Sequence, residues 1–151
     1  MINFTETLKN LKVKPHEIAS IGRVLQSALE AADPFLVIRN NLFISNNELR
    51  VGDRVFSVAS DTRILLISIG KAAYAMAKAA HSRLGNRILD GIIVCKHHPD
   101  ATGDVGHLRL LIGSHPVPDI KSVNAADEIR KLLDNTNQGD IVVFLISGGG
   151  S

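Results

Sequence analysis

The sequence predicts an α/β fold in which a mostly parallel sheet is flanked by helices. Short aliphatic segments at residues 64–69, 91–95, 108–112 and 141–146 are typical of strands that are buried on both faces. Segments with helical periodicity at residues 72–84 and 122–133 alternate with these strands, as they do in parallel sheets. The core is expected to be aliphatic, because only 4% of the residues are aromatic and Trp is absent.

Two further elements are expected before this alternating region. Residues 16–32 are predicted to form an amphipathic helix, because apolar side chains recur every three or four positions. The Asp33-Pro34 pair should end this helix, since a residue before proline is pushed away from helical angles. Residues 42–58 then have the pattern of a small β-hairpin region, with turns at Asn46-Asn47 and Gly52-Asp53.

Composition and charge exclude several classes of protein. A net charge of +2, without any block of consecutive Lys and Arg, disfavours nucleic-acid binding. The single cysteine, Cys95, excludes an internal disulfide framework. The first residues lack the apolar core of a signal peptide, and the longest strongly apolar run is too short to span a bilayer. We therefore expect a cytoplasmic protein that binds small molecules rather than nucleic acid or membranes.

The first candidate site follows the strand at residues 64–69. Ligands of open α/β sheets bind at the carboxyl ends of strands, and the N-terminus of the next helix attracts anions. Gly70 begins a tight turn here, and Lys71 adds a charge that can reach a phosphoryl group or a carboxylate. The motif is not a Walker P-loop, because Leu65 and Ala72 replace the required Gly and Ser or Thr. A solvated lysine in a tight turn is the structural alternative.

The second candidate site is the glycine-rich loop that follows residues 141–146. Successive glycines after a buried strand let backbone amides surround an anion, because no Cβ blocks the approach. The loop is predicted to bind phosphate or carboxylate, and a flexible connector is the alternative. Its residues are Ser147, Gly148, Gly149, Gly150 and Ser151.

A third candidate site lies in the loop at residues 113–119. His115 is a candidate proton carrier near neutral pH, although a lone histidine in such a loop is more often structural. Asp119 is a second candidate, and its alternative role is to begin the next helix. No metal site is expected, because the adjacent His97 and His98 would point apart on an extended chain.

Together and in this order, the motifs resemble the glycerate 2-kinase family, also known as the MOFRL or DUF4147 family, whose older members were labelled hydroxypyruvate reductases. The similarity extends over nearly the whole chain. The residues that carry it are Ala31-Ala32-Asp33-Pro34, Ile69-Gly70-Lys71-Ala72-Ala73 with Met76, Gly113-Ser114-His115-Pro116-Val117-Pro118-Asp119, and Ser147-Gly148-Gly149-Gly150-Ser151.

The resemblance implies a Rossmann-like N-terminal domain, a smaller C-terminal domain and an active site in the cleft between them. The implied reaction transfers the γ-phosphoryl group of ATP to the 2-hydroxyl of D-glycerate, giving 2-phosphoglycerate, with Mg²⁺. The family's active-site lysine corresponds to Lys71, whose role would be electrostatic. Residues 1–151 are then expected to be a truncated N-terminal domain that is inactive alone, because the family's catalytic Asp and Arg would lie beyond Ser151.

Two alternatives to the kinase remain open at this point. One is a hydroxypyruvate reductase that uses NAD(P)H. The other is a non-catalytic module that binds a sugar phosphate or a nucleotide, because a fold does not fix a function. The sequence is also compatible with a homo-oligomer.

Overall fold

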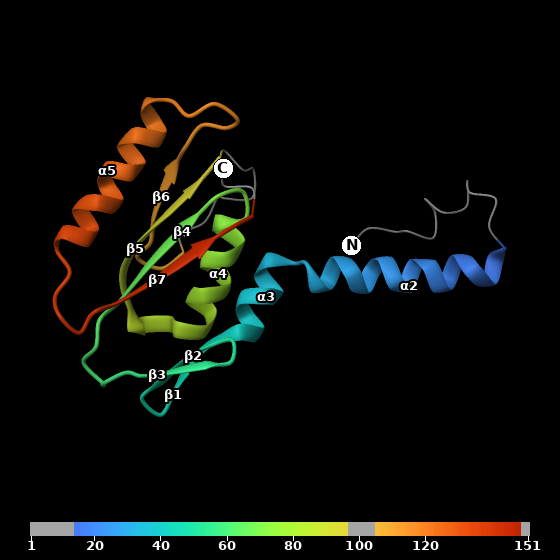
Figure 1. Cartoon of the computed structure of the whole chain (residues 1–151), viewed down its shortest axis with the longest axis horizontal. Coiled ribbons are helices and arrows are strands. Elements are labelled where there is room, and N and C mark those ends of the chain that lie inside the picture. The colour runs from blue at the N-terminus through green and yellow to red at the C-terminus, as the bar shows by residue number, and fades with distance from the viewer. Residues whose placement is uncertain (1–13, 97–104, 149–151) are drawn as a thin grey trace.

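The centre of the molecule is a four-stranded parallel sheet. The computed structural model describes residues 14–96 and 105–148. Its parallel strands are β4 (Ile64–Ile69), β5 (Ile88–Cys95), β6 (Arg109–Ile112) and β7 (Ile141–Ile146). They lie in the spatial order β6-β5-β4-β7 (Figure 1). Counted along the chain this order is 3-2-1-4, the order of the first four strands in the doubly wound nucleotide-binding fold. The predicted α/β fold with a parallel sheet is confirmed.

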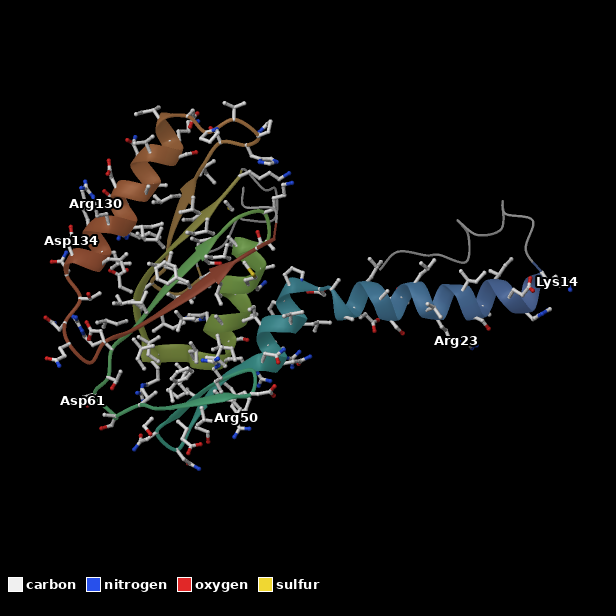
Figure 2. All side chains as sticks on the ribbon, viewed as in Figure 1. Lys14, Arg23, Arg50, Asp61, Arg130 and Asp134 are labelled. Carbon is white, nitrogen blue, oxygen red and sulfur yellow. The ribbon has the colours of Figure 1, made fainter. Side chains whose placement is uncertain are left out.

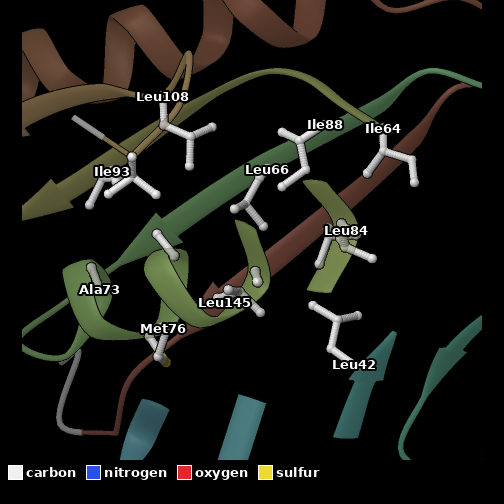
Figure 3. Close-up of a cluster of buried hydrophobic side chains, with 14 of the residues drawn as sticks. Leu42, Ile64, Leu66, Ala73, Met76, Leu84, Ile88, Ile93, Leu108 and Leu145 are labelled. Carbon is white, nitrogen blue, oxygen red and sulfur yellow. The ribbon is translucent and has the colours of Figure 1, made fainter. Parts of the chain in front are cut away.

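Two helices cover opposite faces of this sheet. Helix α4 (Ala73–Leu84), followed by the short 3₁₀ helix Gly85–Arg87, packs on one face, and α5 (Ile120–Asp134) packs on the other (Figure 1). Leu66 of β4 belongs to the core under α4 (Figure 3), whereas its neighbour Ile67 belongs to the core under α5. This alternation follows from the two-residue period of a strand, and it explains why every residue of β4 except Ser68 is aliphatic.

A small antiparallel sheet extends the α4 side of the core. Its strands are β1 (Leu42–Ser45), β2 (Glu48–Val51) and β3 (Arg54–Ser57), paired in that order. Leu42 and Leu49 are buried in the same cluster as α4. Asn46 and Asn47 form the first turn with φ of 48° and 62°, a conformation that asparagine tolerates better than most residues. The predicted hairpin region is therefore present.

The helix at the start of the chain ends where expected, but a second helix follows it at once. Helix α2 spans Pro15–Ala31, and α3 spans Pro34–Asn41, which the sequence analysis did not predict. Asp33 caps α3, because its carboxylate accepts hydrogen bonds from the backbone N–H groups of Phe35 (2.8 Å) and Leu36 (3.2 Å). The Asp-Pro pair thus stops one helix and starts the next, as an N-cap followed by proline does.

Helix α2 stands away from the α/β body (Figures 1 and 2). Its apolar positions are consequently exposed, and they are Ile21, Val24, Leu25 and Leu29. Within the described ranges, 14–96 and 105–148, none of the helices has the length and apolar character that crossing a bilayer requires.

Candidate active site

The turn after β4 is held in place by backbone and side-chain hydrogen bonds. Gly70 has a φ of 111°, which favours glycine, and its N–H donates to the carbonyl of Val94 at the end of β5 (3.0 Å). The fully buried hydroxyl of Ser68 donates to the carbonyl of Ala73 (2.8 Å) and ties the first turn of α4 to β4. These bonds fix the backbone on both sides of Lys71, whose side chain is exposed.

Ser147 packs directly against this turn from the end of β7. Its N–H donates to the carbonyl of Ile69 (3.0 Å), which continues the ladder between β7 and β4. A Cβ placed on Gly70 would lie 2.1 Å from the Ser147 hydroxyl oxygen, so a larger residue cannot occupy position 70 without a shift. The Ser147 hydroxyl is buried and has no hydrogen-bond partner among the residues that the structure describes.

The turn and Ser147 meet where the order of the strands reverses. In the order β6-β5-β4-β7, the chain first moves outward from β4 to β6 and then returns to the other side of β4. Open α/β sheets bind ligands at the carboxyl ends of the strands beside such a reversal. The structure therefore brings Gly70, Lys71, Ser147 and Gly148 together at the carboxyl ends of β4 and β7. The predicted site residues Gly149, Gly150 and Ser151 lie outside the described residues.

A cavity of about 390 Å³ opens at this position and is called here the β4–β7 cavity. Lys71, Ser147 and Gly148 form its polar wall. Its remaining wall is apolar and comes mainly from the α2–α3 junction, α3 and α4. These apolar residues are Ala32, Pro34, Val37, Ile38, Ala72, Met76 and Ile146.

A second cavity, of about 220 Å³, lies at the carboxyl ends of β4, β5 and β6 and is called the β5–β6 cavity. Lys71 lines it as well, so this lysine belongs to both cavities. Its other polar side chains come from Lys96, Ser114, His115 and Ser122. The sequence analysis did not single out Lys96 or Ser114 as site residues, although Lys96 directly follows β5 and so occupies a strand end.

The two candidates of the third loop are placed differently. His115 is exposed and lines the β5–β6 cavity. Asp119 caps α5, where its carboxylate accepts from the N–H groups of Lys121 (2.8 Å) and Ser122 (3.4 Å). A hydrogen bond from the Ser114 side chain, together with these backbone bonds, lowers the pKa of Asp119 below its ordinary value. The structure thus gives Asp119 the helix-starting position that was its alternative.

The described residues suit phosphate and carboxylate groups better than a divalent cation. Glycine amides and lysines are ligands for anions, whereas Mg²⁺ requires carboxylate or similar oxygen ligands. Across residues 14–96 and 105–148, no three His, Cys, Asp or Glu side chains are grouped as a metal site would need. Cys95 lines the β5–β6 cavity, and burial raises the pKa of its thiol.

Comparison with known proteins gives consistent matches. Residues 20–151 match a family described as a domain of unknown function, DUF4147. A glycerate 2-kinase of Pyrococcus horikoshii is 33% identical over 136 residues, which cover 89% of this chain and 30% of that protein. A D-glycerate 2-kinase of Thermotoga maritima is 39% identical over 89 residues, covering 59% of this chain and 21% of that protein.

A solved structure from Pyrococcus horikoshii is similar in fold, with a TM-score of 0.78 and 31% identity over 93% of this chain and 30% of that chain. The chain spans less than a third of the length of the curated relatives described above. Because the family match extends over most of the sequence, the chain belongs to the DUF4147 family, together with the glycerate 2-kinases that its motifs resemble.

Proposed function

We propose that this chain forms part of an enzyme that transfers the γ-phosphoryl group of ATP to the 2-hydroxyl of D-glycerate. The relatives are named glycerate 2-kinases, which supports phosphoryl transfer to the 2-hydroxyl of glycerate, and ATP as the donor is part of the proposal. The observation that carries the proposal within this chain is the position of Lys71, which lines two adjacent cavities at the carboxyl edge of the sheet. Phosphoryl transfer requires the phosphoryl donor and the acceptor to be held side by side next to a positive charge. Its catalysis rests on positioning these two ligands and on stabilising the charge of the transferring group.

The glycine-rich loop and the turn before α4 would hold the phosphates of ATP. Gly70 and Ser147–Gly148 line the place where the sheet order reverses, and Gly149, Gly150 and Ser151 continue the same loop in the sequence. Lys71 would neutralise charge on the phosphoryl group during transfer. A bond forms between the 2-hydroxyl oxygen and the γ-phosphorus while the bond to the β–γ bridging oxygen breaks, and ADP leaves. His115 is the candidate group that accepts the hydroxyl proton.

The remainder of the active site would come from a second domain. The relatives are more than three times as long as the segments that match this chain. We propose that residues 1–151 correspond to the N-terminal domain of a longer enzyme, and that ligands for Mg²⁺ come from that longer protein. A cytoplasmic location is proposed with it, since ATP is the phosphoryl donor and the single cysteine, Cys95, forms no disulfide within the chain.

The test is product identification with the full-length enzyme. Incubation with ATP and D-glycerate should yield ADP and 2-phosphoglycerate, which phosphorus NMR distinguishes from 3-phosphoglycerate. Oxidation of NADH by hydroxypyruvate without any ATP-dependent product would favour the reductase instead. Binding of ATP or D-glycerate with no turnover of either kind would favour a non-catalytic binding module.

A further inference from the structure

The β5–β6 cavity has a chemical character of its own. Its lining includes two lysines and a histidine, Lys71, Lys96 and His115. None of the described residues that line it is an aspartate or a glutamate. The nearby carboxylate of Asp119 is engaged by Ser114 and by the first turn of α5. The two lysines of the lining therefore outnumber the one nearby carboxylate, and such an excess of positive charge favours an anion.

Hydroxyl groups add a second kind of recognition to this cavity. The Ser114 hydroxyl lowers the pKa of Asp119, and its oxygen has lone pairs that can accept a hydrogen bond from a ligand. The Ser114 N–H donates to the Ser122 hydroxyl (3.1 Å), which holds the loop against α5. A ligand that combines an anionic group with hydroxyl donors would satisfy both the lysines and Ser114.

The size of the cavity restricts the ligand further. Its volume of about 220 Å³ is below the range of roughly 300–1,000 Å³ that is usual for sites of larger ligands. Ile69, Val94 and Cys95 line it from the strand ends. A cavity of this volume suits a small ligand such as a three-carbon hydroxy acid better than a whole nucleotide.

We propose that the β5–β6 cavity binds the hydroxy-acid acceptor, with Lys96 holding its carboxylate and Ser114 accepting from one of its hydroxyls. This inference rests on the proposed kinase function. Of these two cavities, Lys96 lines the β5–β6 cavity alone, whereas Lys71 lines both. The carboxylate is therefore assigned to Lys96, and Lys71 remains available at the boundary where the phosphoryl group passes.

The first test is a comparison of Lys96→Gln with the wild type in the full-length enzyme. Loss of a charged hydrogen bond to the carboxylate should raise KM for D-glycerate roughly ten- to a hundredfold, with KM for ATP unchanged. Ser114→Ala should raise the same constant by a smaller factor. Lys78→Ala is the control, because Lys78 is an exposed lysine of α4 that lines neither cavity. An increase in KM for ATP with KM for D-glycerate unchanged would overturn the assignment.

A second test measures binding without turnover. Calorimetric titration of the wild type should give tighter binding for D-glycerate than for its uncharged amide, and Lys96→Gln should remove this preference. A purely structural role of Lys96 would weaken both ligands equally and would contradict the proposal. The two proposals fail separately: an enzyme without ATP-dependent turnover refutes the kinase, whereas an active enzyme with unaltered Lys96→Gln kinetics refutes only the acceptor site.

Discussion

Lys71 is the residue on which the proposed chemistry depends most. It is exposed, and its turn is held by hydrogen bonds that do not involve its side chain. In the full-length enzyme we expect Lys71→Ala to lower kcat by about 10²-fold or more, because a charge that acts on the transition state is lost. Lys71→Arg should restore little activity, since a planar guanidinium does not replace a compact ammonium.

Steady-state kinetics beside a thermal melt measure this effect. The melting temperature should stay close to that of the wild type, and Lys78→Ala should leave both quantities unchanged. A wild-type kcat in the Lys71→Ala enzyme would remove this lysine from the mechanism.

Gly70 and Ser147 form a contact that constrains the same turn. Gly70→Ala should destabilise the 151-residue chain by about 2 kcal/mol or more, because the new Cβ both meets the Ser147 oxygen at 2.1 Å and requires a φ of 111°. Ser147→Ala alone should be close to neutral, since the buried hydroxyl has no partner within the described residues.

Urea unfolding of both single variants and the double variant completes a thermodynamic cycle. The double variant should be less destabilised than the sum of the single variants. Strict additivity would show that the steric contact does not limit position 70.

Asp140 links stability to pH at the other end of the strands, where β4 and β7 begin. It pairs with Arg63, whose Nε lies 2.8 Å from Oδ1, and this pair joins the starts of β4 and β7. The Arg63 side chain, together with the N–H of Asn137, lowers the pKa of Asp140 from 3.8 to about 2. A carboxyl group with a lowered pKa stabilises the fold above its unfolded pKa and loses this contribution as the pH falls towards 2.

The wild type should therefore be more stable than Asp140→Asn at neutral pH, and the difference should shrink between about pH 5 and pH 2. Urea unfolding across this range measures it, with the exposed Asp61→Asn as a control. A difference that stays constant over the range would contradict the linkage.

At the scale of elements, the parallel strands were predictable because they are largely apolar. The start of β5 was not, because Asp90 and Gly91 interrupt its apolar run, and the strand begins at Ile88 rather than at residue 91. The predicted limits at residues 64–69 and 141–146 agree with β4 and β7. Helix α3 was missed because Asp33-Pro34 was interpreted only as a terminator, although an N-cap followed by proline also signals a start. The sequence contained this helix-start signal, but the pair was interpreted only as a helix end.

The candidate site was predictable only in part, for a different physical reason. Gly70, Lys71 and Ser147 follow strands directly, so the strand-end rule identified them. Lys96 follows β5 and Ser114 follows β6. These two residues line the same cavity because β6 lies beside β5 rather than beside β7. That adjacency is a property of the sheet order, which local periodicity does not determine.

Strand β7 presents apolar side chains at the edge of the sheet. Phe144 is 48% exposed and Ile146 is 66% exposed, and β7 pairs with β4 on one side only among the described strands. Exposed apolar edges favour association. We expect the 151-residue chain to self-associate in sedimentation velocity runs at rising concentration, and Phe144→Lys should reduce this.

Val117→Lys is the matched control, because Val117 is 75% exposed in the loop between β6 and α5, and β6 lies at the other end of the strand order from β7. A monomer with the same sedimentation coefficient at every concentration would count against the prediction. Self-association that Phe144→Lys leaves unchanged would place the contact on another surface.

At the scale of the whole molecule, the two cavities would form one side of the cleft in the proposed full-length enzyme. Both open at the carboxyl ends of the parallel strands, and their described linings contain no carboxylate to hold a cation. We therefore expect the purified 151-residue chain to show no glycerate kinase turnover in a coupled assay for ADP, beside an active full-length enzyme. Turnover by the short chain at a comparable rate would mean that residues 1–151 hold the whole catalytic machinery.

The separation of α2 from the α/β body has a consequence for how the molecule fluctuates. A helix of 17 residues is marginal in water unless packing supports it, and α2 leaves Val24 68% exposed and Leu29 45% exposed. Local opening therefore requires little free energy, since few buried contacts are lost. Amide protons in α2 would exchange with solvent while those of β4 stay protected, so the start of the chain can unwind and refold without disturbing the sheet.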